Sequence, residues 1–207
     1  MDFIKTYTFT ATDTAQVVAD FLCAQEQYIL DVYPYVTDFG TGYNNEHVTT
    51  RTGTYNVFSL SCTELKDLLN FIKTSYVDYY TNVMPSSAYD GAMDPHISAW
   101  LHIVKSSEEP ETHQRSPGYP VGWSFISGMY TLSADNTATI FTFNDETVSV
   151  TNVNNTVTIF PPHYRHHTIN QAEGQSSSFI YFDVLFTGKS AAGDSTYFNS
   201  LIKFRDY

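Results

Sequence analysis

The sequence predicts an α+β fold that is mainly β, in which two amphipathic helices precede an antiparallel β-sandwich or barrel. Apolar residues recur at helical spacing in two segments before residue 85. From residue 97 onward, apolar and polar residues alternate in short segments that turn residues separate at regular intervals. Aromatic residues make up 16% of the chain, with 16 Tyr and 15 Phe, and such side chains favour the half-buried surface of a sheet.

The first helix is expected over residues 12–33. Thr12 or Asp13 can cap its N-terminus, and Pro34 ends it because proline cannot continue a helix. A loop rich in Gly, Asn and Thr follows over residues 38–54, and residues 55–60 are expected to form a strand. The broad apolar face of the helix holds Val17, Val18, Phe21, Leu22, Tyr28, Ile29 and Val32.

The second helix begins with the pattern of a capping box, Ser61-Cys62-Thr63-Glu64. In such a box the Ser hydroxyl and the Glu carboxylate bind free backbone amides of the first turn. The helix ends before Pro85, and residues 84–95 are expected to form a loop. Its apolar stripe consists of Leu65, Leu68, Leu69, Ile72 and Tyr76.

The remainder of the chain is expected to form a β core with a polar loop over residues 105–122. Residues 195–204 are expected as a short helix or a last strand. The whole chain, residues 1–207, forms one domain with a helical part (1–95), a β core (96–187) and a C-terminal segment (188–207). The expected strands cover residues 97–104, 123–132, 137–143, 147–151, 156–160, 164–170 and 178–186.

Composition excludes several classes of function. The net charge is −12, from 10 Lys and Arg against 22 Asp and Glu, so we expect no nucleic-acid binding. The chain has no run of about 18 apolar residues, so we expect no membrane span. The N-terminus lacks the apolar core of a signal peptide. Cys23 and Cys62 are expected as buried thiols. Only 15% of residues are charged, which also suits a subunit packed into a larger assembly.

Three histidines fall close together in the segment from Phe160 to Ile169, at positions 163, 166 and 167. Neighbouring residues on a strand point to opposite faces, so His166 and His167 cannot both face the interior of a barrel. At most one of them, together with His163, could bind a shared metal. The alternative is a set of surface histidines.

Several short motifs occur in an order that resembles the prolyl-hydroxylase-like Fe(II)/2-oxoglutarate oxygenases of marine bacteria and their phages. Residues 50–58, the capped helix and Trp100 come first. Residues 126–132, Ile-Ser-Gly-Met-Tyr-Thr-Leu, are similar to that family's Ser-Gly-Val-Tyr-Tyr-Leu strand, and residues 158–166 to its Phe-Pro-Ser-x-x-x-His segment. The resemblance spans about residues 48–187 and implies a double-stranded β-helix, or jelly roll, preceded by two helices.

The resemblance assigns His166 as the distal metal histidine. The proximal His-x-Asp or His-x-Glu motif belongs a few residues before the Ser-Gly pair, where residues 119–123 contain neither ligand. His113 is the nearest substitute, but Gln114 and Arg115 follow it, so Glu111 or a more distant carboxylate would have to complete the site. The family also places an Arg on the last core strand to bind the co-substrate carboxylate, and residues 176–183 have none.

Three hypotheses follow. The first is a non-catalytic jelly roll without cofactors that binds other protein subunits of a larger assembly, as a phage virion or tail-associated component. The second is a hydroxylase that uses Fe(II) and 2-oxoglutarate through His166, His113 or His102 and a distant carboxylate. The third is a glycan-binding module that uses the aromatic loop over residues 119–123. The location is the virion for a phage protein and the cytoplasm otherwise.

The other histidines carry less information in the sequence. His102 is expected as a hydrogen-bonded core residue, and His47 and His96 are expected in loops.

Overall fold

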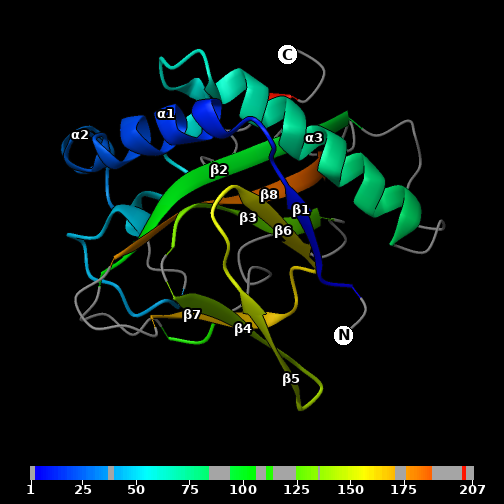
Figure 1. Cartoon of the computed structure of the whole chain (residues 1–207). Coiled ribbons are helices and arrows are strands. Elements are labelled where there is room, and N and C mark those ends of the chain that lie inside the picture. The colour runs from blue at the N-terminus through cyan, green and yellow to red at the C-terminus, as the bar shows by residue number, and fades with distance from the viewer. Residues whose placement is uncertain are drawn as a thin grey trace.

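Two antiparallel sheets face each other in the computed structural model, and three α-helices lie over the outer side of the larger sheet (Figure 1). The structure describes residues 3–36, 40–83, 94–105, 111–113, 125–134, 136–170, 176–187 and 202–203. The helical elements are α1 (Thr12–Cys23), α2 (Glu26–Val32), α3 (Leu65–Asn82) and the 3-10 turns η1 (Val48–Arg51) and η2 (Val57–Ser59). The strands are β1 (Lys5–Thr8), β2 (Asp94–Val104), β3 (Phe125–Ser133), β4 (Thr137–Phe143), β5 (Glu146–Thr151), β6 (Thr156–Phe160), β7 (Arg165–Asn170), β8 (Ser177–Thr187) and β9 (Ile202–Lys203).

The chain crosses repeatedly between the two sheets. The larger sheet has the order β1-β6-β3-β8-β2-β9, and the smaller has the order β5-β4-β7. From β3 onward, β3, β6 and β8 belong to the larger sheet, and β4, β5 and β7 belong to the smaller one. This mostly β architecture with antiparallel sheets is consistent with the jelly roll implied by the sequence.

The predicted strands of the β core are confirmed almost residue for residue. Thr137–Phe143 and Thr156–Phe160 have the bounds expected, and the other core strands differ by one to three residues at their ends. Turn residues at the ends of the β4–β5 and β5–β6 hairpins adopt positive φ, as at Asn144, Asp145 and Asn155. Asn and Asp tolerate this conformation better than other non-glycine residues, which explains why these segments could be assigned as turns.

The main core lies between the larger sheet and the helices. The apolar stripe of α3 is buried as predicted, with Leu68 and Ile72 fully covered. Phe9, which follows β1, packs against Phe71 of α3 and Tyr130 of β3, with ring centroids 4.9 and 6.3 Å apart. The helices therefore seal the outer face of the sheet, and the inner face is left to form a site with the smaller sheet.

The glycine of the predicted Ser-Gly motif has a packing role. Gly128 lies on β3 opposite Phe182 of β8. A Cβ atom at position 128 would come within 2.2 Å of the Phe182 ring, which is fully buried. The position therefore accepts only glycine unless the ring moves.

The first predicted helix is wrong as a single element, because it breaks at residues 24–25 into α1 and α2. The apolar face expected for it was too broad to be buried by one straight helix. The two shorter helices bury Val18 and Leu22 on α1 and Ile29 on α2, whereas Val17, Tyr28 and Val32 are exposed. Neither expected cap residue is used, because Ala11 holds the N-cap position without a side-chain hydrogen bond.

The capping box before α3 does not form. Glu64 itself occupies the N-cap position and makes no capping bond. Its carboxylate instead accepts a hydrogen bond from the Cys62 thiol, whose sulfur lies 3.3 Å from Oε2. Burial of the thiol is the main reason that the pKa of Cys62 is raised. Cys62 is half-buried and Cys23 is exposed, so the expectation of two buried thiols is also wrong.

Residues 55–60 do not form the expected strand, and Val57–Ser59 within them form the 3-10 turn η2. Asn56 explains this difference because its side chain binds locally: Oδ1 accepts from the backbone N–H of Phe58 at 3.1 Å. Such side-chain bonds compete with the ladder of a sheet. The same amide donates to the carbonyl of Ile97 at 2.9 Å and so attaches the turn to β2.

The two ends of the chain add strands to the larger sheet. β1 has four residues, most of them exposed, and was not expected from the sequence. Near the C-terminus, Ile202 and Lys203 pair with β2, which supports the alternative of a last strand; the rest of residues 195–204 lies outside the described residues. None of the described helices is both long enough and apolar enough to cross a membrane.

We expect Gly128→Ala to lower the free energy of unfolding by about 1–3 kcal/mol, the usual cost of forcing extra volume into a packed core. Chemical denaturation measures this change. Phe182→Leu is the matched background, because the smaller side chain gives the new methyl group room. A loss that is equally large in that background would contradict the proposed contact.

Candidate functional site

The inner faces of the two sheets enclose the candidate site. Tyr181 of β8 reaches across to β7, where its hydroxyl lies 3.2 Å from Thr168 Oγ1. Thr139 of β4 lies 3.6 Å from the sulfur of Met129 on β3. These cross-sheet contacts identify the strand faces that line the interior.

His166 and His113 meet at one edge of this interior. His166 is the second residue of β7 and is fully buried, and His113 is almost fully buried. Their backbones form an isolated antiparallel bridge, with N···O distances of 3.1 and 2.7 Å. Residues directly opposite in such a bridge present their side chains on the same face. Accordingly, the two imidazole rings lie with centroids 4.5 Å apart.

Hydrogen bonds fix the same tautomer in both rings. Nδ1 of His113 lies 3.0 Å from the carbonyl of Glu111, and Nδ1 of His166 lies 3.1 Å from the carbonyl of Tyr164. A carbonyl only accepts, so each Nδ1 carries the proton and each Nε2 carries the lone pair. Metal-binding histidines are held in this way, with one ring nitrogen donating to a backbone carbonyl.

Aromatic rings surround His166. Its ring centroid lies 4.8 Å from that of Phe160, 5.8 Å from that of Phe141 and 6.1 Å from that of Tyr181. These rings restrict the orientation of the imidazole. His166 is therefore held in place by packing as well as by its hydrogen bond to the carbonyl of Tyr164.

His163 does not share this environment. It is exposed in the turn before β7, and its ring packs against Phe143 and Tyr164 at 4.9 and 5.1 Å. Partial burial against these rings lowers the pKa of its imidazole. His167 points away from His166, as the alternation of a strand predicts, and its Nδ1 lies 2.9 Å from Thr112 Oγ1.

His102 is the hydrogen-bonded core histidine that the sequence predicts. It stacks on Tyr181, with centroids 4.3 Å apart, and its Nδ1 lies 2.8 Å from Thr49 Oγ1. His96 is part of β2 rather than a loop and faces Lys203 of β9.

His47, expected in a loop, is buried just before η1. Its Nε2 lies 2.6 Å from the carbonyl of Ile103, and its ring stacks on Tyr43 with centroids 3.7 Å apart. The backbone N–H of Thr49 donates to its Nδ1. Nothing in its Asn- and Thr-rich surroundings distinguishes it from a solvated loop residue.

A third metal ligand is not provided by the described part of the chain, where no cluster of three His, Cys, Asp or Glu side chains could hold an ion. Glu111 was one of the carboxylates considered as a third ligand, but its side chain lies against Gly42. Gln114 and Arg115 lie outside the described residues. The two imidazoles therefore fit a metal ion as part of a ligand set, and the carboxylate of the family's set is missing from these residues.

A carboxylate lies on the inner wall at β8. This is the last core strand, where the oxygenase family that the sequence resembles places an Arg to bind the co-substrate. Asp183 is buried beside Tyr181 and accepts a hydrogen bond from Ser127 Oγ at 2.6 Å. Among the described residues, the one buried Lys or Arg is Arg51, which lies on η1 and not on a strand of either sheet. The inner wall described here therefore does not fit a dianionic co-substrate. The sequence feature that could have indicated this buried carboxylate is the single Asp within the apolar segment Phe179–Leu185.

Comparison with solved structures identifies the fold. A Pseudomonas putida prolyl-4-hydroxylase aligns with a TM-score of 0.60 at 8% identity, over 91% of this chain and 90% of that one. A Trichoplax adhaerens prolyl hydroxylase, solved with a peptide of hypoxia inducible factor, aligns at 0.62 and 10% identity over 94% and 88%. The chain has the fold of these oxygenases.

A third neighbour is the non-heme monooxygenase ThoJ in a nickel complex, which aligns at 0.57 and 11% identity over 98% and 80% of the two chains. No family model and no curated protein matches the sequence. At these identities the likeness is one of fold.

We expect Ni²⁺ to raise the melting temperature of the protein saturably, because two imidazoles bind the folded state in preference to the unfolded chain. A metal concentration of 100 times Kd would add about 2.7 kcal/mol of stability. Thermal unfolding with and without Ni²⁺ measures the increment. His166→Ala should abolish it, whereas the matched variant His167→Ala should retain it. An equal increment in His166→Ala would contradict the assignment.

Proposed function

We propose that this protein is an oxygenase-like jelly roll that acts as a binding or structural subunit and does not carry out a 2-oxoglutarate-dependent reaction. The observation that carries the proposal is the inner wall at β8, where Asp183 is buried beside Tyr181. Similarity of fold alone would leave an enzyme equally well supported, so the proposal depends on the chemistry of this wall.

Electrostatics explains why Asp183 matters. A dicarboxylate needs a cationic anchor in a buried pocket, since burying an unpaired charge is costly. Two like charges 4 Å apart repel by about 4 kcal/mol in a partly shielded protein environment. An ionised Asp183 opposes binding of such a ligand, and in no protonation state can it supply positive charge.

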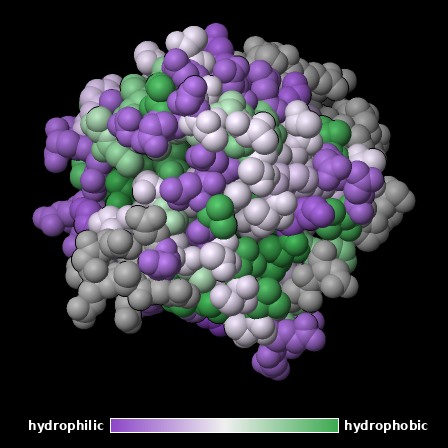
Figure 2. Space-filling model, in the orientation of Figure 1, coloured by the Kyte–Doolittle hydropathy of each residue, from purple (hydrophilic) through white to green (hydrophobic). Residues whose placement is uncertain are grey.

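The surface supports a role in association. Apolar side chains are visible over the first helices (Figure 2). Tyr28 and Val32 of α2, with Tyr35 and Val36 beyond it, are between 38% and 52% exposed. Exposed apolar groups gathered in one region favour a protein–protein contact. The partners that we propose are other protein subunits of a virion or phage tail, in line with the sequence resemblance to phage proteins.

The alternative function is a hydroxylase with an altered metal site. The pairing of His113 with His166, each in the tautomer suited to a metal ligand, favours this alternative. It requires a third metal ligand and a cationic anchor for the co-substrate, both from residues that are not described. The glycan-binding hypothesis rests on residues 119–123, which lie outside the described residues.

Anaerobic titration with Fe(II) and 2-oxoglutarate distinguishes the two functions. We expect no metal-to-ligand charge-transfer absorbance at 2-oxoglutarate concentrations of about 1 mM, a level that detects even weak binding. A saturable absorbance that disappears in His166→Ala would establish the hydroxylase alternative. His167→Ala is the control, because it keeps the pair intact.

A further inference from the structure

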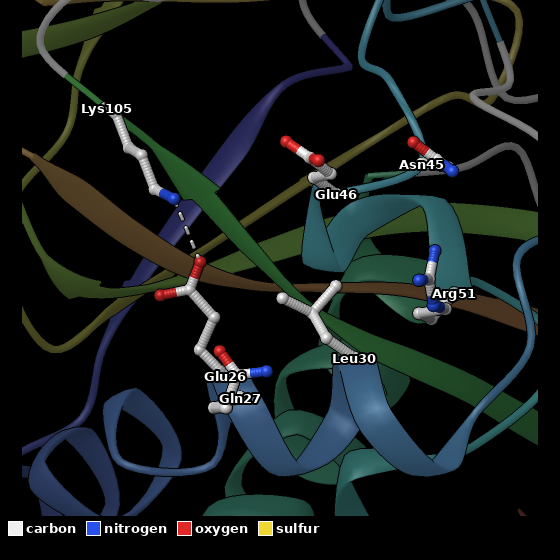
Figure 3. Close-up of a pocket in the computed structure, with 7 residues that line it drawn as sticks. All are labelled: Glu26, Gln27, Leu30, Asn45, Glu46, Arg51 and Lys105. Atoms are coloured by element: carbon white, nitrogen blue, oxygen red, sulfur yellow. Dashed lines mark ion pairs between the residues drawn. The ribbon is translucent and has the colours of Figure 1, made fainter.

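A second site lies outside the barrel, in a hollow of about 520 Å³ between α2, η1 and the end of β2 (Figure 3). Volumes of this size accommodate small ligands. Four of its seven lining residues are charged, although only 15% of the chain is charged. None of the seven lies on either sheet, so the hollow is separate from the histidine pair. The lining residues are Glu26, Gln27, Leu30, Asn45, Glu46, Arg51 and Lys105.

Arg51 is the residue that points to a ligand. Its side chain is only 8% exposed, and its Nη1 donates to Thr50 Oγ1 at 2.8 Å. Its Nε is buried and has no hydrogen-bond partner among the described residues. A buried guanidinium is costly unless an anion pairs with it. The planar fork of the guanidinium matches the two oxygens of a carboxylate.

The other charges limit which anion can bind. Lys105 Nζ lies 3.2 Å from Glu26 Oε1, so these two groups neutralise each other. Figure 3 shows this ion pair on one side of the hollow and Arg51 with Asn45 on the other, with Leu30 and Glu46 between them. Glu46 is exposed and is the remaining negative charge. A doubly charged anion would be repelled by Glu46, whereas a ligand with one charge of each sign fits both Arg51 and Glu46.

We propose that this hollow binds a zwitterionic α-amino acid. The carboxylate pairs with the guanidinium of Arg51, the ammonium group with the carboxylate of Glu46, and the apolar part of the ligand lies against Leu30. The proposal is independent of the function proposed for the barrel, because it uses none of its residues.

Isothermal titration calorimetry with L-leucine tests the proposal. We expect saturable binding with a dissociation constant on the order of 0.1–1 mM, as suits a ligand of this size. L-Leucinamide lacks the carboxylate and N-acetyl-L-leucine lacks the ammonium group, so each should bind at least about tenfold more weakly. Inorganic phosphate should not compete.

Variants connect the binding to the two charges. Arg51→Lys keeps the charge but removes the fork, and Glu46→Gln removes the charge of an exposed residue whose loss leaves the fold intact. Both should weaken L-leucine at least about threefold, and Glu146→Gln, an exposed acid on β5, should not. No binding of L-leucine at about 10 mM, equal affinity in Glu46→Gln, or phosphate binding as tightly as L-leucine would overturn the proposal.

Discussion

The rest of the structure depends on β8, whose successive side chains point alternately to the helices and to the interior between the two sheets. This strand lies inside the larger sheet, between β3 and β2. On its outer side, Phe182 covers Gly128 beneath the helices. On its inner side, Tyr181 reaches β7 and Asp183 binds Ser127. A shift of one residue in its register would exchange the two sets and destroy both the core and the interior wall.

The fold of this chain is that of an oxygenase, but the residues of its described interior differ from those expected of one. The sheet order, the helices on one side and the likeness to prolyl hydroxylases describe an oxygenase scaffold. Within it, His113 and His166 retain an arrangement suited to a metal, because the backbone bridge sets their rings on one face. On the opposite wall, β8 carries the buried carboxylate of Asp183. A scaffold can persist when a site changes, since core packing and site chemistry depend on different residues.

The β core could be predicted well from the sequence because its signals are local. Alternation sets each strand, and residues such as Asn144 and Asn155 mark the turns between them. The pairing of His113 with His166 could be expected only through the resemblance, since 53 residues separate them and no local pattern joins them. His113 stood out for its position before the Ser-Gly pair, but nothing in the sequence showed that Glu111 would lie against Gly42.

The helical half was harder to predict because packing overrides local patterns there. The Ser61–Glu64 pattern satisfies the rule for a capping box, yet the Glu64 carboxylate binds the thiol of Cys62. Residues 55–60 include the β-branched and aromatic residues that favour a strand, but Asn56 closes a turn against the backbone of Phe58. His47 and Arg51 lie in a segment whose composition indicates a solvated loop, and both are buried against the rest of the chain.

In the part of the chain that the structure describes, two imidazole ligands lie in the interior, and neither a carboxylate ligand nor a cationic anchor for 2-oxoglutarate accompanies them. X-ray absorption spectroscopy of the Co²⁺-loaded protein tests this claim directly, because it identifies the atoms around the metal. We expect two imidazole nitrogens with water oxygens in the remaining positions, and a spectrum that 2-oxoglutarate does not change. A protein carboxylate bound to the metal, or a new chelate on addition of 2-oxoglutarate, would contradict it.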